Sequence, residues 1–297
     1  MNEYGITIGL GVLIGTFARI YMLRSDYRQY PGYPHGYVTH LSLGFIAAAL
    51  GSVALPAIAE KQFAAVTFLA LAGQQFREVR NMERESLAAL EAAELVPRGQ
   101  DYIEGIARVF EARNYLVILT ALVTSSANYI TGRPLLSIFV GIVCILLSGI
   151  MMRGKVIGNI ARVKAGKLNF KGALLLVDEI DIMNIGLPGM REKILTDGLG
   201  VVIHPYDDNA RATLHNMGQR QAIAHVATTI LGTKKDVDTP EFTPMVRKNI
   251  DTGAIALFCV PAEKDIESLI AVVERVPVLE SARRAPLKTK AGRIAAD

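Results

Sequence analysis

The stretch that most constrains this fold is a pair of apolar runs separated by one short turn. The runs are Tyr115–Ile130 and Leu135–Met152; neither holds a charged side chain, and only Thr131–Pro134 separates them. At about 1.5 Å per residue, each run approaches the roughly 30 Å hydrocarbon thickness of a bilayer. A buried helical hairpin in a soluble protein is the alternative, but further apolar runs precede this pair. We therefore predict a transmembrane hairpin.

Three earlier apolar runs predict further spans, at Tyr4–Leu23, Val38–Ala59 and Gln62–Phe76. The chain is 51% hydrophobic and 20% charged, which is too apolar for an ordinary soluble protein of two domains. The third run is short for a full crossing, so a re-entrant segment stays open there. Together with the hairpin, these runs predict an α-helical membrane domain of five transmembrane helices over residues 1–153.

The first span has glycines at four-residue spacing, and this spacing lets helix backbones approach closely inside lipid. The pairs are Gly5 with Gly9 and Gly11 with Gly15. We expect Arg19, near the end of this span, to extend its side chain to the membrane interface. The tyrosine-rich stretch 24–37 follows and is typical of an interfacial loop.

Lysine and arginine are concentrated on one side of the predicted membrane. Lys61 and Arg133 flank the opposite side, whereas segments 24–37, 77–113 and the stretch after the hairpin are rich in basic residues. By the positive-inside rule, the N-terminus is outside the cell (inner) membrane and the C-terminal domain is cytosolic. No Asp or Glu lies within the spans, which gives little support to a channel, a transporter or an intramembrane protease.

The cytosolic loop 77–113 is predicted to contain two helices. Residues 82–95 are rich in helix formers, and a second helix begins near Asp101. Asp101 and Glu104 have the spacing of a capping box. Ile103, Ile106, Ala107 and Phe110 then fall on one apolar face.

Residues 102–107 spell Tyr-Ile-Glu-Gly-Ile-Ala, and the chain resembles the YIEGIA family across most of its length. The resemblance implies a sporulation-associated membrane protein of endospore-forming bacteria. Tyr102, Glu104 and Gly105 are our candidate residues for binding a cytosolic protein partner. The alternative is that the motif serves only as a capped helix at the interface.

The C-terminal part is predicted to be a small cytosolic α/β domain at 172–280, because strand and helix patterns alternate. The expected strands are Gly172–Ile180, Leu199–His204 and Ala254–Val260. A helix capped by Asp207 or Asp208 is expected to run to Leu231, and another covers Ala262–Val276. Residues 154–171 read as a basic connector and 281–297 as a disordered basic tail, which suits anionic lipid better than nucleic acid.

Asp251, Thr252 and Gly253 resemble the active-site motif of aspartic proteases. In that family two such aspartates share a proton and activate a water, since like carboxylates at close range cannot both ionise. One copy per chain requires a homodimer. The architecture is also similar to that of a sigma-factor-processing protease of spore formers, with five spans and a cytosolic aspartic-protease domain.

Two features depart from the aspartic-protease pattern. Those enzymes are β-rich, and they have a downstream apolar-apolar-glycine loop, whereas the matching Ile230–Gly232 lies upstream of Asp251. The Asp-Thr-Gly sequence also suits a plain turn before a strand. Two functions therefore stay open: a membrane-tethered aspartic-type endopeptidase that controls a cytosolic sporulation protein, and a non-catalytic anchor or adaptor.

Neither the acidic cluster at a predicted strand end nor the histidines predict a metal site. Carboxylates at strand ends are usually solvated, and the histidines lack the i, i+4 spacing of a zinc helix. These residues are Asp178, Glu179, Asp181, His204, His215 and His225. Gly186–Gly189 lacks the Lys-Ser/Thr of a phosphate loop. We expect no metal, no cofactor and, with only Cys144 and Cys259, no disulfide framework.

Overall fold

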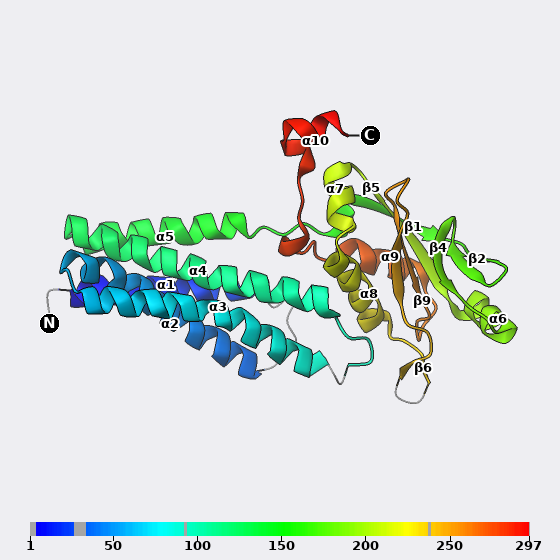
Figure 1. Ribbon diagram of the computed structural model, residues 1–297, viewed down its shortest axis with the longest axis horizontal. Helices are drawn as coiled ribbons and strands as arrows, with labels where there is room; N and C mark the ends of the chain where they lie inside the picture. The colour runs from blue at the N-terminus through cyan, green and yellow to red at the C-terminus, as the bar shows by residue number, and fades with distance from the viewer. Residues whose placement is uncertain (1–3, 27–33, 92–93, 237–238, 297) are drawn as a thin grey trace. The chain divides into compact units, whose positions relative to one another are not determined.

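The computed structural model describes residues 4–26, 34–91, 94–236 and 239–296, and it divides into two compact units (Figure 1). The helical unit consists of Met1–Glu85 and Ile106–Arg153. The α/β unit consists of Ser86–Gly105 and Gly154–Asp297. Each unit is therefore built from two separate stretches of chain. Most of the tyrosine-rich loop expected at 24–37 lies outside the described residues.

Long helices make up the helical unit: α1 (Gly5–Asp26), α2 (Pro34–Ala59), α3 (Phe63–Glu91), α4 (Gln100–Thr131) and α5 (Pro134–Met151). The turn between α4 and α5 lies where the sequence predicts it, with Pro134 beginning α5 as proline at a first helical position favours. The helix expected at 82–95 is instead the second half of α3, since no proline or glycine interrupts helix formers there. Both α3 and α4 continue into the α/β unit.

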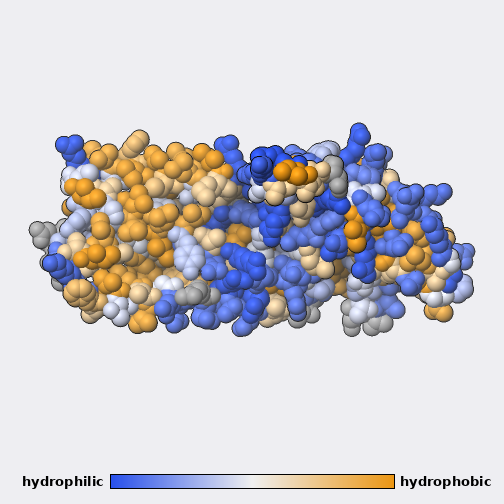
Figure 2. Space-filling model, turned by 45° about the horizontal axis from the view of Figure 1, so that its top comes forward, coloured by the Kyte–Doolittle hydropathy of each residue, from blue (hydrophilic) through white to orange (hydrophobic). Residues whose placement is uncertain are grey.

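Three described helices are long and apolar enough to cross a membrane, at Gly5–Arg24, Gly36–Ala59 and Pro134–Met151. These spans are consistent with a membrane protein, and the face of the helical unit seen in Figure 2 is largely apolar. The expected spans 62–76 and 115–130 do not reach this apolarity. The first is followed at once by the charged half of α3, and the second has buried Thr, Ser and Asn side chains. Hydropathy therefore does not support five spans.

The predicted close packing of α1 is confirmed for one of its two glycine pairs. A Cβ on Gly15 would lie 2.7 Å from the Cβ of Ala48 and 2.9 Å from that of Ala121. A Cβ on Gly11 would lie 2.4 Å from the hydroxyl of Ser52. No such contact exists at Gly5 or Gly9. Gly11 and Gly15 thus allow α1 to approach α2 and α4.

Arg19 does not reach the membrane interface as expected. Its side chain is fully buried, and its guanidinium carbon lies 5.2 Å from the centre of the Phe110 ring. Phe110 also contacts His40, since the centres of the two rings are 4.4 Å apart. His40 Nε2 in turn lies 3.4 Å from Glu83 Oε1. The cation lies inside the helical unit rather than in water, and the face of the Phe110 ring stabilises it.

An antiparallel sheet forms the centre of the α/β unit, with strand order β1 (Ala161–Gly166), β5 (Leu199–Pro205), β9 (Ile255–Cys259), β8 (Met245–Lys248). A second sheet contains β2 (Leu168–Lys171), β3 (Leu174–Val177) and β4 (Ile180–Asn184). The expected strands at 199–204 and 254–260 are confirmed as β5 and β9. Both are buried on two faces, which is why they read as continuous apolar runs.

Helices and the small sheet cover opposite faces of the central sheet (Figure 1). On one face Ile255, Leu257 and Cys259 pack with α8 (Met217–Leu231) and α9 (Ile266–Arg275). On the other face Ala256 and Phe258 pack with β3, β4 and Ile194 of α6 (Pro188–Asp197). Alternate side chains of one strand therefore enter two separate cores, and the result is a layered α/β unit.

Four expectations about the C-terminal part are wrong in detail. The connector expected at 154–171 contains a 3-10 turn, β1 and β2. The single strand expected at 172–180 is instead the start of the β3–β4 hairpin, because Asp178 turns the chain with a φ of 53°. The long helix at 208–231 is two helices, α7 (Asp208–Leu214) and α8, since Asn216 caps a new start. The C-terminal tail is ordered into two 3-10 turns and α10 (Lys290–Ile294).

The remaining strands are short. β6 (Lys235–Asp236) and β7 (Thr239–Pro240) pair as a small hairpin between α8 and β8.

Candidate functional site

Asp251, Thr252 and Gly253 lie in the turn that joins β8 to β9. Asn249 organises this turn, because its side-chain oxygen accepts hydrogen bonds from the amides of Asp251 at 2.9 Å and Thr252 at 3.0 Å. The amide of Asn249 donates to the carbonyl of Ala254 at 2.8 Å and closes the hairpin. Gly253 has a φ of 71°, which an L side chain rarely adopts. The motif thus has the composition of an asparagine-initiated turn.

Two side chains of α7 and its C-cap hold the turn from outside. Arg211 Nη2 donates to the carbonyl of Ile250 at 2.7 Å, and His215 Nε2 donates to the carbonyl of Gly253 at 3.0 Å. Burial lowers the pKa of His215, and the nearby cations Lys248, Arg211 and Arg220 lower it further, while the bond to Gly253 opposes this shift. A neutral imidazole protonated on Nε2 satisfies this geometry. The backbone of the turn is therefore fixed at two carbonyls.

The Asp251 carboxylate itself is exposed and takes part in no hydrogen bond or ion pair within the described chain. Thr252 is exposed too, and its hydroxyl accepts a long bond from the amide of Ala254 at 3.4 Å. One copy of the turn contributes one carboxylate. An aspartic-protease pair needs a second, so the predicted catalytic residues form half of such a site.

The candidate partner-binding residues lie at the start of α4, which packs against α8. The amide of Tyr102 donates to the side-chain oxygen of Gln221 at 2.9 Å, so a residue of α8 caps the first turn of α4. Asp101 lies inside the helix and is not its N-cap, because α4 begins at Gln100. The expected capping box is therefore replaced by a cap from a distant part of the chain.

Tyr102 and Gly105 are buried and do not form an exposed surface. The Tyr102 side chain is 3% exposed, and its ring meets the ring of His225 edge-on at 6.3 Å. A Cβ on Gly105 would lie 2.6 Å from the hydroxyl of Ser281. Glu104 is half-buried. Within the α/β unit, these residues form an internal joint between α4, α8 and the C-terminal segment.

Buried polar contacts complete this joint. His225 Nδ1 donates to the carbonyl of Val96 at 2.7 Å, and Arg98 forms an ion pair with Glu91. Burial lowers the pKa of Arg98 and raises that of Tyr102, and the interaction between the two opposes both shifts. The phenol is therefore neutral near pH 7 and suits a structural hydrogen bond rather than proton transfer.

A cavity of about 340 Å³ opens beside the joint. Its walls are the 95–99 loop, one side of α8 and the segment that precedes β8. The lining residues are Leu95, Val96, Pro97, Arg98, Gly99, Gln221, Ala224, Pro240, Thr243 and Pro244. Most of these side chains are apolar, so the cavity suits an apolar side chain better than a charged small molecule.

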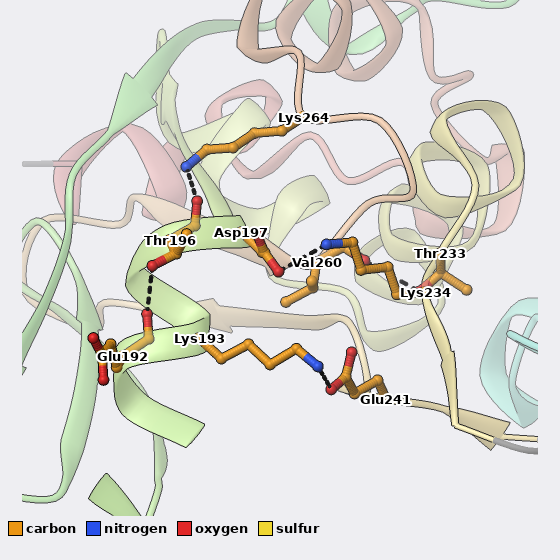
Figure 3. Close-up of polar contacts among 9 residues, drawn as sticks. All are labelled: Glu192, Lys193, Thr196, Asp197, Thr233, Lys234, Glu241, Val260 and Lys264. Atoms are coloured by element: carbon orange, nitrogen blue, oxygen red, sulfur yellow. Dashed lines mark hydrogen bonds and ion pairs between the residues drawn. The ribbon is translucent and has the colours of Figure 1, made fainter. Parts of the chain in front are cut away.

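Three lysines fix α6 to neighbouring loops, as Figure 3 shows. The contacts are Lys193 with Glu241, Lys234 with Asp197 at 2.7 Å, and Lys264 with the carbonyl of Thr196. The bond to Lys234 lowers the pKa of Asp197, and the bond to Glu241 raises that of Lys193. Every drawn lysine has a partner, so this cluster serves packing. No periodic pattern in the sequence predicts this cluster, since its members come from three separate segments.

The remaining residues considered in the sequence do not form a site, and those described next have structural roles. Asp178 accepts from the amide of Lys167 at 2.8 Å and so stabilises the β3–β4 turn. Arg191 donates to the carbonyls of Gly172, Ile185 and Gly186, so α6 begins on a network of carbonyls. Among the described residues, no group of three or more His, Cys, Asp or Glu is placed to hold a metal. Burial raises the pKa of Cys259 to about 12.

Comparison with known proteins gives two matches and one negative result. A family described as YIEGIA protein matches residues 7–289. The uncharacterized protein YphB of Bacillus subtilis (strain 168) is 44% identical over 286 residues, which cover 96% of each chain. No solved structure matches. The likeness extends over the helical and the α/β units alike.

Proposed function

The chain belongs to the YIEGIA family, and we propose that it is a sporulation-associated protein of the cell (inner) membrane that acts as a membrane-tethered aspartic-type protease. Asp251 of two copies would supply the reactive pair. The observation that carries this proposal is an exposed, unengaged carboxylate on a turn whose backbone is fixed by Asn249, Arg211 and His215. The role in sporulation rests on the family resemblance.

Exposure of Asp251 in one copy is what a shared site requires. If each copy contributes one carboxylate, that carboxylate must lie on the surface that meets the second copy. In such a pair one carboxyl is protonated and the other ionised. The ionised group takes a proton from water, whose oxygen bonds to the peptide carbon; the other carboxyl protonates the leaving nitrogen as the C–N bond breaks.

A non-catalytic adaptor is the second candidate, and the fold favours it. The Asp251 turn belongs to an antiparallel sheet flanked by helices, whereas aspartic proteases are β-rich. In this role the α/β unit would bind a cytosolic protein without cleaving it, and Asp251 would be only a turn residue. The cavity beside the joint is available for an apolar side chain of that partner.

One experiment separates the two candidates. The full chain is co-expressed with candidate sporulation proteins, and wild type is compared with Asp251→Asn at matched abundance. Asp181→Asn is the control, since Asp181 is also exposed and also lies in the α/β unit. We expect a target to disappear with wild type and Asp181→Asn and to persist with Asp251→Asn. If all three chains leave every target intact but co-purify with one, the protein is an adaptor.

We further propose that all five helices cross the membrane, with the N-terminus outside and the α/β unit in the cytosol. The Tyr4 hydroxyl contacts Glu60, and the Tyr4 ring stacks on Tyr129 at 5.9 Å. These contacts support a position for the start of α1, the α2–α3 turn and the α4–α5 turn at the same end of the helical unit. Helices α3 and α4 would then each run the length of the helical unit. In α4 the polar side chains of Ser125 and Asn128 are buried against other helices, with bonds to Ser52 and Thr7.

A further inference from the structure

Strand β8 is an edge strand, and its outer side pairs with no other strand of the described chain. In the described sheet β8 pairs with β9 alone, in the register Arg247 with Ala256. Asn249 donates to Ala254, so the residues two and four positions before it, Arg247 and Met245, also direct their backbone groups toward β9. Val246 and Lys248 therefore direct theirs outward. Consistently, the Val246 carbonyl accepts a bond from the side chain of Arg220 at 3.4 Å.

Positive charge lines this edge. Arg247 and Lys248 are exposed on β8, and Arg220 of α8 lies beside it. Arg220 and Arg247 donate only to backbone carbonyls, those of Val246 and Ile182, and none of the three cations forms an ion pair with a carboxylate of the described chain. Burial lowers the pKa of Arg220, Arg247 lowers it further, and the nearby carboxylate of Asp101 opposes both effects. The edge thus has a net positive potential, which Asp101 offsets only in part.

The two ends of β8 adjoin the features already described. The segment before it, with Thr243 and Pro244, forms a wall of the 340 Å³ cavity. The segment after it is the turn that carries Asp251. The cavity, the edge and the carboxylate therefore follow one another along about eight residues of chain, which is roughly 25 Å when extended.

We propose that the outer edge of β8 binds an extended acidic peptide segment of the substrate or partner as an added strand. This inference rests on the proposed function, whose protein target would be held in this way. The backbone groups of Val246 and Lys248 supply the main-chain bonds, and the cations select acidic side chains. An incoming amide replaces Arg220 at the Val246 carbonyl, which frees the guanidinium to pair with a carboxylate of the peptide.

The occupant is a peptide rather than another polyanion because the edge offers strand-forming groups as well as charge. A lipid headgroup or a nucleic acid would use the cations but not the amides of Val246 and Lys248. An apolar side chain of the peptide suits the cavity next to Pro244. The edge therefore distinguishes an extended chain from a folded or branched anion.

The test measures binding to full-length protein in detergent, in the Asp251→Asn background so that no cleavage intervenes. The probe is a fluorescent peptide of alternating glutamate and valine. The double variant Arg247→Glu with Lys248→Glu is expected to weaken binding about tenfold, since two attractions become repulsions. The matched control is Arg162→Glu with Lys164→Glu, two exposed cations on β1, the other edge strand. That control should leave binding unchanged.

Two further probes decide whether a strand is formed. A peptide of equal charge interrupted by prolines should bind at least tenfold more weakly, because proline cannot donate to a ladder. Equal binding of this peptide, of single-stranded RNA or of vesicles rich in anionic lipid would overturn strand addition. Loss of binding in the β1 control would place the site elsewhere. All these readouts are independent of whether Asp251 cleaves anything.

Discussion

At the scale of single residues, the family signature is explained by contacts inside the α/β unit. Tyr102 is buried, its amide is capped by Gln221, and its ring meets His225. Gln221 and His225 are four positions apart in α8 and so lie on one face of that helix. Together they hold the first turn of α4 and the loop before it. The signature therefore reads as a joint rather than as a partner-binding surface.

His225 makes this joint sensitive to pH. Burial lowers its pKa below the usual value near 6.5, and Arg98 adds to this, while the bond to Val96 and the charge of Glu94 oppose it. The unfolded chain then binds more protons than the folded one at mildly acidic pH. The stabilisation is complete above about pH 6.5 and decreases as the pH falls toward the folded pKa. We expect the melting temperature to fall by several degrees between about pH 7 and pH 5.

The variant His225→Gln tests this, because an amide can still donate to Val96 but does not titrate. Its melting temperature, followed by scanning fluorimetry in detergent, should depend less on pH than that of wild type. His204→Gln, at an exposed position on β5, is the control. An unchanged pH dependence in His225→Gln would mean that another group titrates.

At the scale of helices and strands, close approach of α1 to its neighbours depends on Gly15 and not on Gly9. Gly15→Leu would place a side chain against Ala48 and Ala121, whereas Gly9→Leu adds the same group where no atom lies within 4 Å. We expect Gly15→Leu to cost about 1–3 kcal/mol of stability through overpacking. Thermal unfolding in detergent measures it. Equal melting temperatures for the two variants would contradict this packing.

Elements with strong local signals could be predicted from the sequence, and those set by distant contacts could not. β5 and β9 are continuous buried runs, and the turn before Pro134 contains glycine and proline, so each has a local cause. β1 was missed because its buried Ala161 and Val163 alternate with the cations Arg162 and Lys164, which resemble a basic connector. The alternation was a usable signal.

The candidate site likewise contains residues that could be assigned to it from the local sequence and residues that could not. Asn249 lies two residues before Asp251 in the sequence, so a turn at this point follows from local composition. Arg211 and His215 could not be assigned to it, since they come from α7, about forty positions earlier. Gln221 is likewise far from Tyr102 in the sequence, and single-chain periodicity contains no information on such a pair.

At the scale of the whole molecule, the two stretches of the α/β unit constrain the path of the chain. Residues 86–105 and 154–297 pack into one unit, so in the proposed membrane topology both lie on the same side. The chain between them must then cross an even number of times. Since α5 is apolar enough to span, α4 should span as well, although its own hydropathy is lower.

Cysteine labelling tests this path in a chain without Cys144 and Cys259. With five crossings, a membrane-impermeant maleimide should label Lys61→Cys in intact cells, because the α2–α3 turn is outside. Gln100→Cys, at an exposed position before the signature, should react only after permeabilisation. Labelling of Gln100→Cys in intact cells would mean that α3 does not cross and that the α/β unit faces outward.

The divided construction of the α/β unit also sets an order for biosynthesis. Residues 86–105 leave the ribosome before α5 and the rest of α4, but their partners Gly218, Gln221 and His225 follow much later. In the proposed topology, the early segment waits while the α4–α5 hairpin inserts, so folding of the complete α/β unit would report that insertion is finished. A fragment that begins at Gly154 would lack the early segment and expose the α8 surface that normally contacts it. Such a truncation should be recognised by proteases and chaperones as an incomplete product.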